Sequence, residues 1–207
     1  MLVSEPMVDP IQASCAAYLL AGGKSSRMGE NKAFLNFHGQ TLLDRARTEL
    51  TTACGSVTIV GDPATFAGYH PVISDIFPGC GPLAGIHAAL THSSAELNVM
   101  LAVDMPFVSA DLLGFLLHAA EQAPAAATVP QIALGLQPLC AVYRRTFTPI
   151  AERALKLKQY KIDAAFANLP IHVIGEQELA VAGFSEKNFL NLNTPDDRRA
   201  ADSIQGG

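Results

Sequence analysis

A short apolar run that breaks into a glycine-rich, basic loop constrains the fold of this chain more than any other stretch. Cys15–Leu20 has the length and character of a β-strand, and it ends at Ala21-Gly22-Gly23. Glycine lacks a Cβ and adopts unusual backbone angles, so the N–H groups of such a loop can approach a ligand closely. Three cations and two hydroxyls follow within nine residues: Lys24, Ser25, Ser26, Arg27 and Lys32. A strand that leads into this loop predicts a site for a polyphosphate.

The loop matches neither of the two common phosphate-binding motifs. A P-loop would need a second glycine at position 28, where the sequence has Met28. The dinucleotide fingerprint G-x-G-x-x-G is also missing from this loop, since Gly22 and Gly23 are adjacent. The chain is therefore neither a Walker ATPase nor an ordinary Rossmann dehydrogenase. A flexible surface loop is the simpler interpretation of a glycine pair beside a lysine, but the strand, the hydroxyls and the three cations together favour a binding site.

The pattern after the loop predicts alternating helices and strands. Thr41 is placed to cap a helix that ends at Cys54-Gly55, and the run Val99–Val103 is apolar throughout, as in a central strand covered on both faces. We also expect an extended segment at 33–37, strands at 57–60, 72–73, 128–129, 137–143 and 171–174, and helices that begin at Pro82 and Ser109 or span 150–157 and 164–167. This alternation predicts an α/β fold with a mainly parallel, Rossmann-like sheet and helices on both faces. We expect a single three-layer domain at 15–207 after a flexible extension at 1–14.

Composition and charge limit the class of protein. The 207 residues are 49% hydrophobic and 16% charged, which suits one folded domain with a sizeable core. A net charge of −5 argues against a broad basic face for nucleic acid, and no apolar run approaches the roughly 20 residues of a membrane span. The four cysteines form no C-x-x-C pair, which predicts reduced thiols in a cytoplasmic protein and argues against a zinc site.

Two carboxylates follow predicted strands at what we expect to be one edge of the sheet. Asp75 comes after the short strand at 72–73, and Asp104 comes directly after the apolar central strand. Ligands of open α/β sheets bind in the crevice at the carboxyl ends of the strands, so Asp104 is a candidate ligand for Mg²⁺. A turn or cap role before Pro106 is the alternative interpretation, and the polyphosphate loop upstream favours the metal.

Two further segments offer hydrogen-bonding groups. Gly81-Pro82-Leu83 opens a predicted helix, where backbone N–H groups can meet an anion or the edge of a base. Near the C-terminus, Thr194-Pro195 is typical of a helix start. The asparagines before it are candidate ligand contacts, since two of them alternate as on the face of a strand: Asn188, Asn191 and Asn193.

Several motifs together resemble those of the molybdenum cofactor guanylyltransferases, a MobA-like family of nucleotidyltransferases. The loop is similar to the family pattern LAGG-x-S-x-RMG-x-x-K. Further matches in the family's order are Ser74-Asp75, Gly81-Pro82-Leu83-Ala84-Gly85, Val103-Asp104-Met105-Pro106, Gln137-Pro138-Leu139 and Asn191-Leu192-Asn193-Thr194-Pro195. The resemblance covers most of residues 15–200, and several weak motifs in the right order make a strong joint signal.

The resemblance implies a nucleotidyltransferase fold and transfer of GMP from GTP to the phosphate of molybdopterin, with release of pyrophosphate. It implies that Asp104 holds Mg²⁺ and nucleotide, and that Arg27 and Lys32 share in catalysis. By similarity, Leu20, Ala21, Gly22, Lys32, Asp75 and Asp104 would contact the GTP, and the glycine loop and the helix start add the candidates Gly23, Gly81, Pro82 and Leu83. Pterin contacts then fall to Asn188, Asn191 and Asn193. Expected partners are the two substrates and, transiently, cofactor-insertion proteins, with the chain a monomer or weak oligomer.

The sequence departs from the family pattern in two places. Asn31 precedes the motif lysine, where the family often has Asp, and Val60-Gly61-Asp62 stands where many members have an asparagine near the base. Asp62 offers a carboxylate to the N1–H and N2 amino group of guanine. These departures concern base specificity more than reaction type. Two alternatives stay open: transfer of CMP to molybdopterin or to a sugar or polyol phosphate, against which the Ala-Gly-Gly motif leans, and a catalytically idle nucleotide-binding module.

Overall fold

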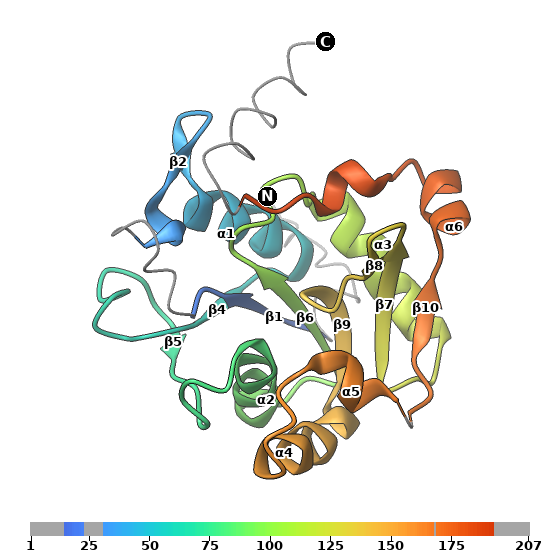
Figure 1. Ribbon diagram of the computed structural model, residues 1–207. Coiled ribbons are helices and arrows are strands. Elements are labelled where there is room, and N and C mark those ends of the chain that lie inside the picture. Colours follow the sequence, from blue (N-terminus) through green and yellow to red (C-terminus); the bar gives the residue numbers. More distant parts are fainter. Residues whose placement is uncertain (1–14, 23–30, 168, 193–207) are drawn as a thin grey trace, which may run out of the picture.

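The computed structural model describes residues 15–22, 31–167 and 169–192. These residues form a central sheet in the order β10–β7–β9–β6–β1–β4–β5, with β8 paired to β7 (Figure 1). The strands are β1 Cys15–Leu20, β4 Val57–Val60, β5 Val72–Ile73, β6 Leu97–Ala102, β7 Ala127–Ile132, β8 Gly135–Leu136, β9 Cys140–Arg144 and β10 His172–Ile174. A separate hairpin pairs β2 (Asn36–Phe37) with β3 (Gln40–Thr41). The mainly parallel sheet predicted from the sequence is confirmed.

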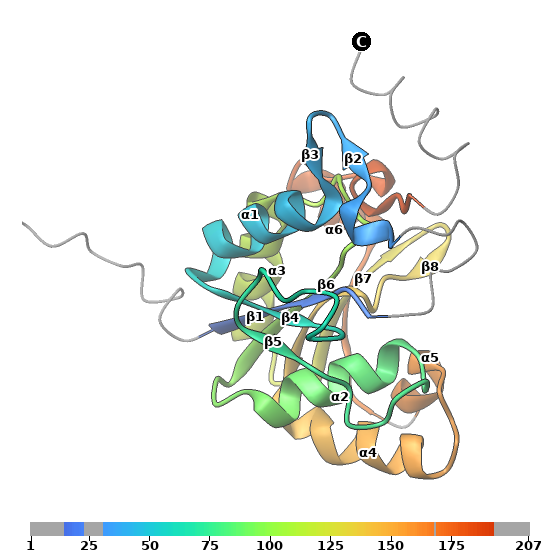
Figure 2. The same cartoon turned by 90° about the vertical axis from the view of Figure 1, so that its left-hand side faces the viewer.

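Helices cover both faces of this sheet, which confirms the three-layer architecture (Figures 1 and 2). One layer contains α1 (Leu42–Cys54), α3 (Ala110–Gln122) and α6 (Glu176–Val181), and the other contains α2 (Pro82–His92), α4 (Thr148–Lys156) and α5 (Ile162–Phe166). Each layer buries its own hydrophobic cluster against the sheet, with Leu43 and Leu116 in the first and Leu83 and Leu155 in the second. Burying apolar area on both faces stabilises the sheet as the middle layer of one domain.

The helix ends follow the predicted signals. The Thr41 hydroxyl accepts a hydrogen bond from the Asp44 N–H at 3.0 Å, and Gly55 ends the same helix with φ +75°. The Ser109 hydroxyl caps α3 by accepting from the Leu112 N–H at 3.3 Å, and Pro82 is the first residue of α2. Local side-chain chemistry therefore sets where these helices begin.

Strand direction decides which loops meet at the functional edge of the sheet. β1, β4, β5 and β6 run parallel to one another, so their carboxyl ends share one edge. All six residues of β6 are buried, as expected for a central strand. β9 runs antiparallel to β6 and to β7, so the residues before it arrive at that same edge. The Ala102 N–H donates to the Leu139 carbonyl at 2.8 Å and fixes this junction.

Three predicted segments differ in the structure. The strand expected at 137–143 begins only at Cys140, because Gln137 opens a turn in which its carbonyl accepts from the Cys140 N–H at 3.1 Å. The extended segment at 33–37 is wrong in its first part, since residues 32–34 form a 3₁₀ helix capped by Asn31. The prediction that two of the asparagines near the C-terminus alternate on a strand face is not confirmed. Asn188 lies in a 3₁₀ helix, Glu186–Phe189, and Asn191 lies in no strand, while Asn193 is outside the described residues.

The predicted extension at 1–14 also lies outside the described residues. Across the part of the chain that is described, none of the helices is both long enough and apolar enough to cross a membrane.

Candidate active site

A cavity of about 490 Å³ opens at the carboxyl ends of β1, β4 and β6, where α2 begins. We call it the nucleotide cavity. The predicted residues that line it are Leu20, Ala21, Gly22, Lys32, Asp75, Gly81, Pro82 and Asp104. Its volume falls in the usual range for small-molecule sites, and its position is the crevice in which open α/β sheets bind ligands. The fold thus brings together residues that are up to 84 positions apart in the sequence, from Leu20 to Asp104.

A cation and a carboxylate face each other in this cavity. The Lys32 Nζ lies 3.6 Å from the Asp104 Oδ2, and about a fifth of each side chain is exposed. Asn31 positions the lysine, because its side-chain oxygen accepts from the Ala33 N–H at 3.0 Å and caps the 3₁₀ helix that contains Lys32. The departure at Asn31 therefore has a local structural role. The Asp104 carbonyl accepts a hydrogen bond from the Leu192 N–H at 2.8 Å. This bond joins the loop after β6 to the segment that contains Asn191.

The second carboxylate of the cavity, Asp75, is half-buried beside the start of α2. Loss of hydration raises the pKa of this carboxyl above its ordinary value. Among the described residues Asp75 makes no hydrogen bond or ion pair, so its oxygens are available to a ligand. Gly85 allows this packing: a Cβ there would lie 3.3 Å from the Leu20 side chain and 3.7 Å from the Asp75 Oδ1. The helix thus presses its backbone against both the strand end and the carboxylate.

Backbone geometry opens the cavity at two glycines. Gly81 precedes α2 with φ +75°, an angle that favours glycine, and it has no side chain to cover the first turn of the helix. Gly22 follows β1, and a Cβ there would point at the backbone of β4, 3.7 Å from the Val60 carbonyl oxygen. Both positions leave main-chain N–H groups within reach of an anionic ligand.

Other predicted residues lie away from this cavity. The Asp62 carboxylate is exposed and holds its own turn, since it accepts from the Ala64 N–H at 3.1 Å and from the Thr65 hydroxyl at 2.7 Å. These bonds lower its pKa, led by the one from Thr65. Leu83 belongs to the first turn of α2 and is buried. Asn188 accepts from the Ser185 N–H at 2.9 Å and donates to the Phe107 carbonyl at 3.2 Å, a structural use of its amide. Gly23 and Arg27 lie outside the described residues.

A second cavity of about 320 Å³ adjoins the first. The two share Leu139, and Met105 in the second directly follows Asp104 in the first. Of the predicted residues, Asn191 lines this second cavity. Sequence reasoning missed Lys161 and Asp163, which also line it. These two stand just before and within a five-residue helix, outside every motif, so no local pattern in the sequence marks them.

The residues present are compatible with a magnesium ion. Within the described ranges, no three His, Cys, Asp or Glu side chains gather as a metal cluster. Mg²⁺ does not need such a cluster, since it typically binds one or two carboxylates and completes its shell with water and substrate phosphates. Asp104 supplies a hard carboxylate donor in the nucleotide cavity, so the residues present fit this ion.

Comparison with known proteins gives the family. Residues 17–171 match the family model described as "MobA-like NTP transferase domain". A Clostridium perfringens protein named "Probable molybdenum cofactor guanylyltransferase" is 33% identical over 186 residues, 88% of this chain and 93% of that protein. A Desulfosudis oleivorans molybdenum cofactor guanylyltransferase is 32% identical over 188 residues, 89% and 93% of the two chains. The crystal structure of molybdopterin-guanine dinucleotide biosynthesis protein A from Archaeoglobus fulgidus aligns with TM-score 0.81 and 29% identity over 91% of this chain and 97% of that one. This protein is therefore a member of the MobA-like NTP transferase family of nucleotidyltransferases.

Proposed function

We propose that this enzyme transfers GMP from GTP to the phosphate of molybdopterin and releases pyrophosphate. Its relatives are named as molybdenum cofactor guanylyltransferases over nearly the full length of both chains. The observation that carries the proposal is the nucleotide cavity, which is lined by both the Lys32–Asp104 pair and the Asp75 carboxylate. The ion pair suits charged phosphates, and the uncommitted carboxylate suits a base that carries hydrogen-bond donors.

Asp75 is the group that selects guanine in this proposal. Guanine presents two neighbouring donors, N1–H and the 2-amino group, to which a carboxylate can bind with both oxygens. Cytosine offers one amino donor beside an acceptor nitrogen, which would face the carboxylate with like polarity. The half-buried position of Asp75 strengthens this discrimination, because an unpaired group out of water is costly. This carboxylate favours GMP transfer over the CMP alternative.

The triphosphate would extend from the base toward Gly22 and Lys32. In the reaction, a phosphate oxygen of molybdopterin forms a bond to the α-phosphorus of GTP, while the bond from that phosphorus to the bridging oxygen breaks. Pyrophosphate departs with the electron pair. The attacking oxygen is already anionic, so the step needs no general base. Lys32 and the Gly22 N–H reduce the repulsion between the two anions and hold them in line.

Asp104 would hold Mg²⁺, which as a Lewis acid offsets the charge on the phosphates and on the leaving pyrophosphate. The Lys32 ammonium lies 3.6 Å from the same carboxylate and attracts it, which helps to orient Asp104 in the cavity. Arg27, which lies outside the described residues, is proposed to add a further cation from the glycine-rich loop. We place the reaction in the cytoplasm, where the four free cysteines would stay reduced.

The test is pyrophosphate release from purified protein with Mg²⁺ and molybdopterin, with GTP, CTP and ATP offered separately. We expect release with GTP, and at least about tenfold less with CTP because Asp75 loses one of its two hydrogen bonds. Preference for CTP would keep the mechanism and overturn the base assignment. Binding of GTP without release in the presence of any acceptor would instead identify an idle nucleotide-binding module.

A further inference from the structure

The second cavity lies where the far end of the acceptor must extend. An acceptor whose phosphate attacks the α-phosphate of GTP places that phosphate near Asp104 and its ring system beyond it. One cavity in the described part of the chain adjoins the nucleotide cavity and shares Leu139 with it. Met105, the residue after Asp104, also lines it. We call it the acceptor cavity.

The walls of the acceptor cavity combine apolar and polar side chains. Met105, Leu136, Leu139 and Ile162 supply the apolar part. A cavity of about 320 Å³ with such walls suits a planar heteroaromatic ring whose edge carries hydrogen-bonding groups. The polar groups come from separate segments: Gln137 before β9, Asn191 after the last 3₁₀ helix, and Lys161 with Asp163 at α5.

Of these polar groups, Asp163 is the one with both oxygens uncommitted. The Gln137 amide already donates to the Gly135 carbonyl at 3.1 Å. Asp163 lines the cavity from an exposed position in α5 and makes no hydrogen bond or ion pair within the described residues. Burial raises the pKa of the Tyr143 phenol and the Asp163 carboxylate adds to that rise. The same phenol donates to the carbonyl of Pro138, a residue of the cavity wall, at 2.8 Å.

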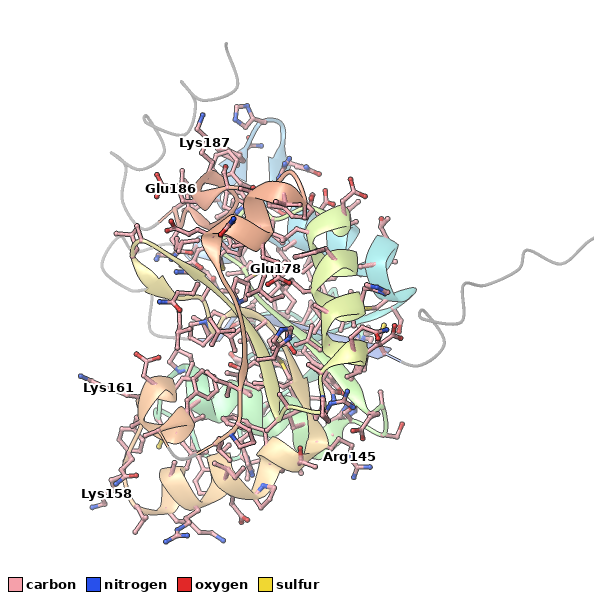
Figure 3. The ribbon with its side chains drawn as sticks, turned by 90° about the vertical axis from the view of Figure 1, so that its right-hand side faces the viewer. Arg145, Lys158, Lys161, Glu178, Glu186 and Lys187 are labelled. Atoms are coloured by element: carbon pink, nitrogen blue, oxygen red, sulfur yellow. The ribbon has the colours of Figure 1, made fainter. Side chains whose placement is uncertain are left out.

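Lys161 does not neutralise this carboxylate. No ion pair joins the two among the described contacts, and Figure 3 shows the Lys161 side chain pointing away from the body of the protein. Its stem lines the cavity while the ammonium reaches solvent at the mouth. The acceptor cavity therefore presents a carboxylate to its occupant, and it calls for a ring edge with two adjacent donors.

We propose that the acceptor cavity binds the pterin ring of the acceptor and that Asp163 determines this specificity. A pterin presents a 2-amino group beside N3–H, the same pair of donors that guanine presents. Asp75 would thus bind the guanine of the dinucleotide product, and Asp163 would bind its pterin in the adjoining cavity. This inference rests on the proposed function, since it takes molybdopterin as the acceptor.

The first test is Asp163→Asn, which keeps the size of the side chain and removes one acceptor. We expect the KM for molybdopterin to rise about 10- to 100-fold, the range for losing a hydrogen bond to a charged group. We expect kcat to change less than about threefold, and the Kd of a fluorescent GTP analogue to stay unchanged. The matched control is Asp111→Asn, which removes a carboxylate from the first turn of α3 and lines neither cavity.

The second test does not depend on turnover. Free 6-hydroxymethylpterin is titrated against the wild-type protein by its own fluorescence, with the 2-oxo analogue 6-hydroxymethyllumazine as the comparison ligand. We expect the wild type to prefer the pterin at least about tenfold, because lumazine lacks the 2-amino donor. Asp163→Asn should lose this preference, and Asp111→Asn should keep it.

The outcomes separate the two proposals. An unchanged KM in Asp163→Asn, with GMP transfer intact in the wild type, would place the pterin elsewhere and overturn this inference alone. No GMP transfer by the wild type would defeat the proposed function, and the pterin titration would still decide what the cavity binds. A loss of GTP affinity in Asp163→Asn would assign the cavity to guanine and also overturn the inference.

Discussion

The two halves of the sheet build their cavities in different ways. In the half formed by β5, β4, β1 and β6, every strand runs in the same direction and delivers its carboxyl end to the nucleotide cavity. In the other half, β9 runs against its neighbours, so the acceptor cavity receives the turn before a strand. The remainder of that cavity comes from α5 and from the segment around Asn191.

This difference explains how the two cavities divide the chemistry. The parallel half follows the general rule for open α/β sheets, in which ligands bind at strand ends and helix N-termini. Its glycines and its Lys32–Asp104 pair suit phosphates. The half with the reversed strand supplies apolar surface and a carboxylate without a hydrogen-bond partner among the described residues. One sheet can thus hold two substrates side by side, with Leu139 between them.

The largest effect should come from Asp104→Ala, which disables only the parallel half. It removes the proposed metal ligand and leaves Lys32 without the carboxylate 3.6 Å away. We expect kcat for pyrophosphate release to fall by about 10³-fold or more, because charge on the leaving group is no longer offset. Far-ultraviolet circular dichroism and pterin binding should match the wild type. A folded Asp104→Ala enzyme that keeps wild-type turnover at ordinary Mg²⁺ would contradict the metal assignment.

A smaller effect is expected from Asp75→Asn, the counterpart of the change at Asp163. The affinity for GTP should fall about 10- to 100-fold, and the preference for GTP over ITP, which lacks the 2-amino group, should largely disappear. Because burial raises the Asp75 pKa, the wild-type carboxylate gains its proton at a higher pH than an ordinary Asp. GTP affinity should therefore weaken as the pH falls through that range, and the Asn variant should lack this dependence. Fluorescence titration from pH 4 to 8 measures both effects.

The next prediction concerns the stability of the contact between the two halves. His87 lies in α2, which packs against α4. Its buried ring contacts Phe77 edge-on, with 5.2 Å between ring centres, and it faces Glu152 and Lys156 of α4. Burial lowers its pKa, Glu152 opposes this and Lys156 reinforces it. The folded state then binds fewer protons than the unfolded state. Stability should be fully present above the ordinary His pKa of about 6.5 and should decrease as the pH falls below it.

The matching measurement is the Tm of wild type and His87→Gln at pH 7.5 and pH 5.5. We expect the variant to lose part of the pH dependence, a difference of a few degrees for a domain of this size. The outermost pair in this layer, Glu152–Lys156, should contribute little, since it is exposed. An identical pH dependence in both proteins would show that His87 is not the group responsible.

The smallest effect concerns helix α1 and should leave both cavities untouched. Thr41→Ala removes the cap that the Asp44 N–H donates to, which costs about 1 kcal/mol of stability. For a chain of this length the Tm should fall by about 2–4 °C. Ser109→Ala at the start of α3 is the comparison variant, with a similar loss expected. KM values for both substrates should stay at wild-type levels, and a change in either would mean that the caps also position the cavities.

The parallel half was largely predictable because its candidate site residues closely follow strands. Gly22 follows β1, Asp75 follows β5 and Asp104 follows β6 with two residues or fewer between. An apolar strand is easy to recognise, so the residue after it can be placed at the sheet edge. The expectations that failed lie where a competing local bond decides the structure. Asp62 was a candidate for guanine, but its carboxylate is held by Ala64 and Thr65 in a turn.

By itself, the sequence predicted the order of the main strands and helices, the helix caps and the family resemblance, because each depends on residues that are neighbours in the chain. Only the tertiary structure decided that β9 reverses, that Leu139 stands between two cavities, and that Asp163 faces the acceptor side. Those facts depend on packing between segments that lie far apart in the sequence. No local pattern records such packing, since burial and strand pairing arise only when the whole core forms.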